Sequence, residues 1–180
     1  MQRVELPRGS IAIVDTSVLY AMGAPSNDKY QAFEEYVTRR DVAVRIPDHV
    51  AEELGESPEA YRYQRDRLRS AQDAGWLEQA EVDFIDPGVS DAIDRTRERI
   101  YSLSADDVTE DDVETTDAVL AGLAYQYAAE QSYQVAVLVS DRLAEEAIAD
   151  VLSSMDLRVE INIVEGRTFL DELRDDVHEL

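Results

Sequence analysis

The runs IAIVD at residues 11–15 and VAVLVSD at residues 135–141 decide the fold class of this chain. Both are short, apolar and rich in β-branched residues, as expected for strands that are covered on both faces of a parallel sheet. Each run ends at an aspartate and leads into a segment of helical periodicity. Strands that alternate with helices along a chain are typical of an α/β protein with a mostly parallel sheet.

Outward from these two runs, apolar segments predict strands and periodic segments predict helices. The predicted strands are residues 11–14, 42–46, about 82–85, 135–139 and 159–164. The predicted helices are residues 29–39, one opening near residue 48, 59–74, 89–103, 116–131, 142–152 and a short one after residue 166. Residues 104–114 are acidic and aperiodic, which indicates an exposed loop. We expect one domain over residues 1–180, with a helical elaboration of the sheet at about 59–114.

Charge is the strongest compositional signal. The chain holds 40 acidic and 17 basic residues, a formal net charge of −23, and Lys29 is its only lysine. The repulsion within such a surface is relieved by salt, because the Debye length falls to about 3 Å in about 1 M salt. Acidic residues in place of lysines resemble the proteins of halophiles that keep molar potassium in the cytoplasm. We therefore expect a cytoplasmic, halophilic protein.

The composition also excludes several classes of protein. There is no cysteine, so disulfides, zinc ribbons and thiol nucleophiles are absent. The two histidines, His49 and His178, lie far apart in the sequence, which leaves little for a histidine metal site or a Ser-His-Asp triad. No apolar run approaches the length that spans a bilayer, and the segment MQRVELPRGS lacks a signal-peptide core. We expect no membrane partner.

Two acids follow the two most apolar predicted strands. Asp15 comes directly after IAIV, and Asp141 comes after VAVLVS. In an open doubly wound sheet, strands 1 and 4 are commonly neighbours at the topological switch point, and their carboxyl ends flank the crevice where ligands bind. On that arrangement the two aspartates face each other.

A third acid falls on the buried face of a predicted helix. Asp117 shares a face with Leu120, Ala121 and Ala124, so it lies at the end of an apolar stripe and not on the solvent side.

The fourth acid comes from the stretch IPDHVAEEL at residues 46–54. Glu53 falls on the flank of the apolar face, whereas Glu52 points nearly opposite to it, so Glu53 is the candidate and Glu52 the fallback.

Each acid also has a simpler explanation. Asp15, Asp117 and Asp141 all lie where a helix begins, and aspartate is favoured as an N-cap or first-turn residue. Capping does not require aspartates at the ends of both strands, however, nor acids that line up with the apolar stripes. Several carboxylates in one crevice repel one another, and a bound Mg²⁺ or Mn²⁺ removes that repulsion.

The sequence resembles the PIN-domain family of ribonucleases. The matching motifs are IAIVDTSVLYAM, IPDHVAEEL, TDAVLAGLA and LVSDRLAEEA, in the family's order between residues 11 and 147. The resemblance implies a three-layer α/β/α sandwich around a mostly parallel five-stranded sheet. It also implies a quartet of acids that binds one or two Mg²⁺ or Mn²⁺ ions, and by motif match these are Asp15, Glu53, Asp117 and Asp141.

The resemblance extends to the polar residues beside the acids. Thr16 and Ser140 match the small polar residues that orient ligands or water, although many PIN proteins have Thr-Asn-Asp where this chain has Val-Ser-Asp. The resemblance implies RNA as substrate, and either a toxin with an antitoxin partner or an RNA-processing enzyme. PIN-like proteins often pair, so a homodimer is also implied. The long middle region departs from the shortest toxin-type members.

An acidic protein needs specific surfaces to hold RNA, because molar salt removes most of the gain from counterion release. In YRYQRDRLR, the residues Arg62, Arg65 and Arg69 share one helical face and form the candidate RNA-binding surface. Arg95 and Arg99, one helical turn apart, are a second candidate. The alternative for both is a solvated helix in which arginines pair with carboxylates.

Three rival functions can be compared with the sequence. A haloacid-dehalogenase-like phosphatase needs a second aspartate two residues after the first, where this chain has Ser17. A phosphoaspartate receiver needs a lysine after a late strand, but Lys29 is in the wrong place. The third is a PIN-like module that binds RNA or protein without cutting, and the presence of all four acids argues against it. The sequence therefore favours a metal-dependent endoribonuclease.

Overall fold

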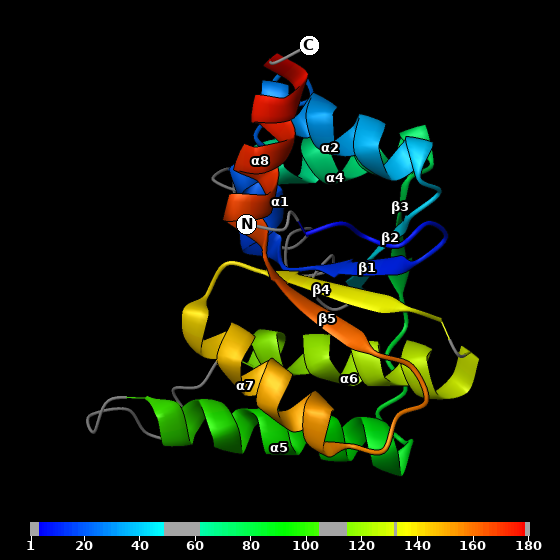
Figure 1. Cartoon of the computed structure of the whole chain (residues 1–180), viewed down its shortest axis with the longest axis vertical. Coiled ribbons are helices and arrows are strands. Elements are labelled where there is room, and N and C mark those ends of the chain that lie inside the picture. The colour runs from blue at the N-terminus through cyan, green and yellow to red at the C-terminus, as the bar shows by residue number, and fades with distance from the viewer. Residues whose placement is uncertain (1–3, 49–61, 105–114, 132, 179–180) are drawn as a thin grey trace.

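The computed structural model of the chain describes residues 4–48, 62–104, 115–131 and 133–178 (Figure 1). Its strands are β1 (Ile11–Val14), β2 (Ala43–Pro47), β3 (Leu77–Ala80), β4 (Val135–Val139) and β5 (Ile161–Glu165). The helices in these ranges are α1 (Thr16–Met22), α2 (Asp28–Arg39), α4 (Arg62–Ala74), α5 (Pro87–Leu103), α6 (Thr115–Gln131), α7 (Arg142–Ser154) and α8 (Gly166–His178).

The described strands form one parallel sheet in the order β3-β2-β1-β4-β5. The direction of winding reverses at β1, because β2 and β3 extend the sheet on one side of it and β4 and β5 on the other. Val14 pairs with Leu138, so the residues that follow β1 and β4 leave the sheet at neighbouring positions. The predicted switch point between the first and fourth strands is therefore confirmed.

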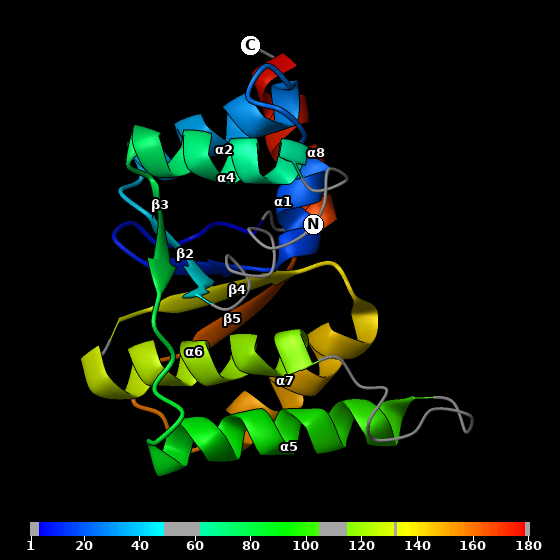
Figure 2. The same ribbon diagram turned by 180° about the vertical axis from the view of Figure 1, so that it is seen from behind.

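Helices cover both faces of the sheet. Figures 1 and 2 show α1, α2, α4 and α8 on one face, and α6 and α7 on the other. The helix α5 packs on the outer side of α6 and α7 and does not rest on the sheet. The predicted α/β/α sandwich is confirmed, with α5 as an additional outer layer.

The helix α6 is buried on all sides along its middle. Seven of its described residues are each at most 1% exposed: Ala118, Val119, Leu120, Ala121, Leu123, Ala124 and Ala128. Gly122 lies within this run and allows α5 to approach, since a Cβ there would lie 2.6 Å from Cγ1 of Ile93. A helix that is apolar all round belongs between other elements, and α6 lies between the sheet and α5.

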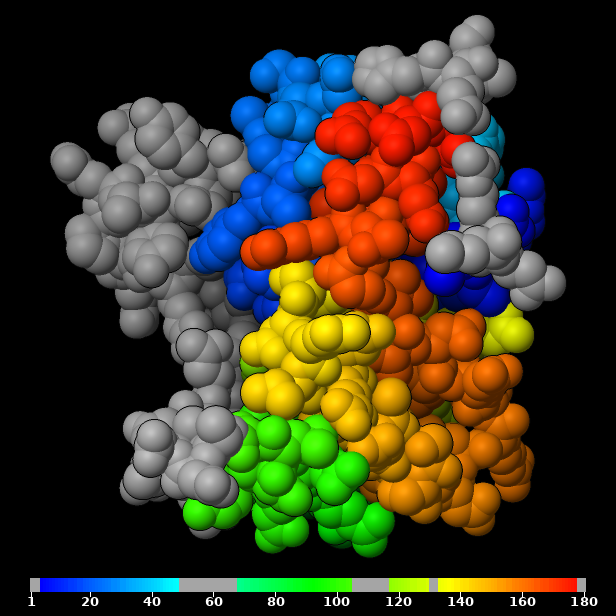
Figure 3. Space-filling model, turned by 60° about the vertical axis from the view of Figure 1, so that its left-hand side comes forward, coloured from blue at the N-terminus to red at the C-terminus, as the bar shows by residue number. Residues whose placement is uncertain are grey.

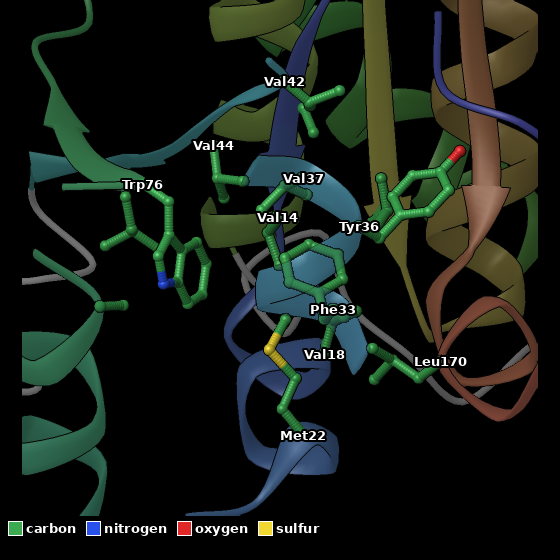
Figure 4. Close-up of a cluster of buried hydrophobic side chains, with 14 of the residues drawn as sticks. Val14, Val18, Met22, Phe33, Tyr36, Val37, Val42, Val44, Trp76 and Leu170 are labelled. Carbon is green, nitrogen blue, oxygen red and sulfur yellow. The ribbon is translucent and has the colours of Figure 1, made fainter. Parts of the chain in front are cut away.

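The other face of the sheet is packed with aromatic residues. Phe33 of α2 lies among Val14, Val18 and Leu170 (Figure 4). Its ring contacts Trp76 edge-on, with centroids 5.6 Å apart. The ring of Phe169 in α8 packs in the same way on the rings of α2. This cluster ties α1, α2 and α8 together, and so fixes where α1 and α8 begin at the edge of the sheet.

One strand lies elsewhere than the sequence predicts. The apolar run VDFI at residues 82–85 predicts the third strand, but β3 is Leu77–Ala80. Residues 82–85 instead belong to the connection to α5, where Oδ1 of Asp83 accepts hydrogen bonds from the backbone N–H groups of Ile85 and Asp86. The prediction is wrong because β3 is an edge strand whose two middle residues are exposed and polar.

The other predicted elements in the described ranges lie within a few residues of those observed. The closing helix α8 is longer than the short helix expected, with 13 residues. Gly75, which follows the last residue of α4, has φ +88°, a conformation that favours glycine. The helix expected to open near residue 48 and the loop at 105–114 lie outside the described residues. In the parts of the chain that the structure describes, no helix is long and apolar enough to cross a membrane.

Candidate functional site

Asp15 lies at the end of β1 and is buried, with 7% of its surface exposed. Its backbone N–H donates to the carbonyl of Leu138 at 3.0 Å, which extends the pairing of β1 with β4 by one residue. Asp15 occupies the N-cap position of α1, yet its side chain makes no capping hydrogen bond. Helix capping therefore does not explain this carboxylate.

Hydroxyl groups hold the Asp15 carboxylate in place. Ser17 Oγ lies 2.6 Å from Oδ2 of Asp15, and Thr16 Oγ1 lies 3.3 Å from Oδ1. Ser17 Oγ is also hydrogen-bonded to Ser140 Oγ. Because Ser17 has one proton and the carboxylate can only accept, Ser17 donates to Asp15 and Ser140 donates to Ser17. This chain of hydrogen bonds joins the end of β4 to the acid at the end of β1.

Asp141, at the end of β4, is differently arranged. It is exposed and forms the N-cap of α7, where its Oδ1 accepts from the backbone N–H groups of Leu143 at 2.8 Å and Ala144 at 3.3 Å. The capping explanation thus holds for this acid. The cap uses Oδ1 alone, so Oδ2 is available to another ligand.

Asp117 lies in the first turn of α6 and is partly exposed. Figures 1 and 2 show that α6 begins at the same end of the sheet as α1 and α7. Glu53 and the fallback Glu52 lie outside the described residues. Within the described ranges, no three acidic or histidine side chains are grouped so that they could hold a metal ion. The structure therefore brings the aspartates to one edge of the sheet without closing them into a ligand cluster.

Two more acids lie at this edge. Glu145 follows Asp141 by one helical turn, and its pKa is raised by burial and by the nearby carboxylate of Glu165, while Arg142 lowers it. Glu165, the last residue of β5, accepts hydrogen bonds from the backbone of α8 through both of its oxygens. A raised carboxyl pKa means that negative charge is disfavoured where Glu145 lies. Burial is the larger cause of this shift, and the Glu165 carboxylate adds to it.

The chemistry at Asp15 fits a hard divalent cation. No described arginine or lysine forms an ion pair with this carboxylate. A buried carboxylate without a cation is costly, because burial removes water that would otherwise stabilise the charge. Carboxylate oxygens are the ligands that Mg²⁺ and Mn²⁺ prefer. Asp15 is thus the described acid best suited to bind a metal.

The predicted RNA-binding helix is only partly described. Arg62, Arg65 and Arg69 all lie in α4, and Arg69 is exposed. The side chains of Arg62 and Arg65 lie outside the described residues. Their role in RNA binding stays a prediction.

Arg95 and Arg99, the second candidate RNA-binding pair, are instead paired with carboxylates. Arg95 pairs with Asp91 one turn earlier in α5, at 3.0 Å. Arg99 pairs with Asp150 of α7, with Nη2 2.9 Å from Oδ2. These arginines are engaged in ion pairs on solvated helices.

Sequence reasoning missed Ser17, Glu145 and Glu165. From the sequence alone, Ser17 was considered only as the residue that replaces the second aspartate of a phosphatase. A hydroxyl two residues after a strand-end acid is nevertheless well placed to reach that acid's carboxylate. Glu165 ends β5 just as Asp15 follows β1, so the rule that selects the aspartates also points to it. No sequence signal shows that Glu165 raises the pKa of Glu145, because that interaction depends on how α7 packs beside β5.

A parallel sheet with helices on both faces, and with an acid after β1 and after β4, defines an α/β protein whose candidate site lies at the switch point of the sheet. The family model of the halobacterial PIN domain matches residues 8–178. The chain belongs to this family, which confirms the resemblance seen in the sequence motifs. PIN domains are generally nucleases.

Other comparisons add little. No curated protein matches the chain by sequence. Among solved structures, the fold is similar to a chain in the crystal structure of VapBC2 from Rickettsia felis bound to a DNA fragment from its promoter. The similarity covers 86% of this chain and 99% of the other, at 9% sequence identity and a TM-score of 0.47. At these values it carries no argument about function.

Proposed function

We propose that this protein is a divalent-metal-dependent endoribonuclease whose site lies where β1 and β4 end. The observation that carries the proposal is Asp15, a carboxylate that is 7% exposed and that neither caps α1 nor pairs with a described cation. Membership of a PIN-domain family supports a nuclease. The proposal assigns the metal to Mg²⁺ or Mn²⁺ and the substrate to RNA.

The proposed ligands are Asp15, Asp117 and Asp141, with Glu53 as a further ligand or as the group that orients the attacking water. A metal ion held by these residues would act as a Lewis acid that activates water and neutralises charge on the phosphoryl oxygens. No histidine base is required. The aspartates are held by elements that begin or end at one edge of the sheet, so the sheet itself orders the site.

The neighbouring hydroxyls act as positioning residues. Ser17 fixes Oδ2 of Asp15, and Ser140 fixes Ser17 in turn. Thr16 makes only a long hydrogen bond to Oδ1, which leaves that oxygen free to bind a ligand. The low polarity around the strands strengthens the attraction between this carboxylate and a cation.

Cleavage of labelled single-stranded RNA in molar KCl tests the proposal, with Mn²⁺ or Mg²⁺ present. Wild type should cut, and Asp117→Asn should not. The matched control is Asp94→Asn, which makes the same chemical change at an exposed position of α5 and should cut like wild type. Mn²⁺ calorimetry gives a readout besides activity, and Asp15→Asn should bind the ion more weakly. Unchanged Mn²⁺ binding by Asp15→Asn contradicts the assignment of this ligand.

A second candidate is a PIN-like module that binds RNA or a protein without cutting. It is favoured by one observation, that the described acids do not form a group of three able to hold a metal. A wild-type protein that neither cuts RNA nor binds Mn²⁺ would favour this alternative.

The proposed partners are RNA, an antitoxin and a second copy of the chain. The antitoxin and the homodimer stay predictions from the family resemblance, as does the choice between a toxin and an RNA-processing enzyme. A toxin should slow the growth of a host when it is expressed without its antitoxin, whereas a processing enzyme should not. Light scattering in molar KCl measures whether the chain pairs.

A further inference from the structure

Two arginines follow β4 and β5 at the edge of the sheet where Asp15 lies. Arg142 begins α7, directly after Asp141, and Arg167 is the second residue of α8. Val139 of β4 pairs with Glu165 of β5, and this is the last pair of the two strands. Arg142 and Arg167 follow these paired residues by three and two positions. Both side chains are exposed.

Neither arginine is neutralised by the described part of the protein. Among the described residues, Arg142 and Arg167 form no ion pair, whereas Arg45 and Arg99 each pair with a carboxylate. Arg142 acts on Glu145 only at longer range, by lowering its pKa. In a chain with 40 acidic and 17 basic residues, a guanidinium without a carboxylate is available to an anion from outside.

The positions of these arginines are not explained by helix stability. A cation in the first turn of a helix is disfavoured by the helix dipole, and both arginines lie in a first turn. The presence of arginine at these two positions therefore has another cause than helix stability.

Packing holds Arg167 close to the candidate site. Gly166 lets α8 begin against α1, because a Cβ at this position would overlap with Cγ2 of Val18. The Glu165 carboxylate fixes the same turn, with hydrogen bonds from the N–H groups of Arg167 at 3.2 Å and Thr168 at 2.6 Å. Figure 3 shows α1 in blue, the start of α8 in orange and the start of α7 in yellow together on this face.

We infer that Arg142 and Arg167 hold the phosphate backbone of single-stranded RNA as it crosses the ends of β4 and β5 from Asp15. The inference rests on the proposed function of the site and adds the path of the substrate to it. A guanidinium matches the oxygens of a phosphate with two parallel hydrogen bonds. Contacts to phosphates position a nucleic acid without reading its bases, so this contact tolerates any sequence.

Binding of a fluorescent single-stranded RNA, measured by anisotropy over a series of KCl concentrations, tests the inference. The measurement uses the full chain with the Asp117→Asn change, so that binding is read without cutting. Arg142→Gln and Arg167→Gln should each weaken binding about tenfold, the loss expected for one charged hydrogen-bonded contact. Each should also reduce the slope of log Kd against log salt by about 0.7, the value for one phosphate contact to a single strand.

The matched control is Arg158→Gln. Arg158 is also exposed and unpaired among the described residues, but it precedes β5 and so lies at the opposite end of that strand. This variant should bind RNA like its parent. Arg142→Lys and Arg167→Lys keep the charge, so they should retain the salt slope and lose only part of the affinity.

The outcomes separate the inference from the proposed function. If wild type cuts RNA and the two glutamine variants bind RNA with the affinity and salt slope of Arg158→Gln, the inference is overturned and the nuclease stands. If wild type does not cut but binding falls in the two variants, the inference stands and the protein is a binding module. If the chain binds no RNA at any salt concentration, both are overturned.

Discussion

At the end of β1 an aspartate is buried and makes no helix cap, whereas at the end of β4 an aspartate is exposed and caps the next helix. Asp15 accepts hydrogen bonds from the hydroxyls of Thr16 and Ser17. Asp141 accepts them from the backbone of α7. In the sequence the two acids look alike, since each follows an apolar strand and precedes a helix.

The difference shows that a strand-end aspartate can serve mainly the helix or mainly the site. A capping carboxylate is already stabilised by two N–H groups, so a metal gains less from it. A buried carboxylate held only by hydroxyls is less well stabilised, so a bound cation stabilises it more. We therefore expect Asp15 to dominate metal binding and Asp141 to contribute to both stability and chemistry.

The largest expected effect is that of Asp15→Asn. The amide keeps the size of the side chain and removes the charge, so RNA cleavage should fall by about 10³-fold or more, as for other groups that act directly at a reacting centre. Stability should stay within about 1 kcal/mol of wild type or rise, because an unpaired buried charge is removed. Cleavage rates and urea unfolding in high salt measure the two quantities. Cleavage at the wild-type rate would contradict the central role of Asp15.

The comparison also shows what the sequence can predict of the fold. The strands β1 and β4 are predicted to the residue, since a continuously apolar, β-branched run between helices has few other interpretations. The edge strand β3 is misplaced, because its middle residues Glu78 and Gln79 are exposed and a more apolar run follows it. Strand prediction from apolarity fails where the middle of a strand faces solvent.

The candidate site is predictable in its position and not in its detail. Topology alone brings the ends of β1 and β4 together, so the positions of Asp15 and Asp141 follow from the predicted strand order, while their role as metal ligands stays a prediction. Whether a carboxylate caps a helix depends on its side-chain rotamer, which periodicity does not report. The link from Ser140 through Ser17 to Asp15 depends on contacts between residues 123 positions apart. Such contacts follow from packing and leave no local signal.

Two substitutions of Asp141 separate its two roles. Asparagine caps a helix about as well as aspartate, so Asp141→Asn should keep the stability of the protein, whereas Asp141→Ala should lose about 1 kcal/mol. Both changes remove the charge. If Asp141 is also a metal ligand, both variants should lose RNA cleavage by about 100-fold, a smaller loss than at Asp15. Unfolding and cleavage assays on the two variants measure the two roles separately. Full activity in Asp141→Asn would show that Asp141 caps the helix and is not a metal ligand.

Ser17→Ala should have a smaller effect on the site. The variant removes the hydrogen bond to Oδ2 of Asp15 and the link to Ser140, while the acid itself remains. Loss of a group that orients a metal ligand typically lowers metal affinity by about 10- to 100-fold. Mn²⁺ calorimetry measures this loss, and Ser17→Thr, which keeps a hydroxyl, should restore part of the affinity. Equal affinities in all three proteins would show that the Asp15 carboxylate needs no such support.

The smallest expected effect concerns the crowding of acids beside the end of β4. Burial and the Glu165 carboxylate raise the pKa of Glu145, so the folded protein binds this proton more tightly than the unfolded chain. Above the raised pKa the folded state carries the penalty of the charge. Glu145→Gln should then be more stable than wild type by less than about 1 kcal/mol, because the side chain is only partly buried.

This advantage of Glu145→Gln should depend on pH. It should shrink as pH falls through the raised pKa towards the ordinary value of a glutamate, since the folded wild type then becomes neutral at this site. Urea unfolding from neutral to acidic pH measures the change, with the exposed neighbour Glu146→Gln as control. A gain in stability that is the same for both variants, or that does not change with pH, would show that the crowding at β4 has no energetic consequence.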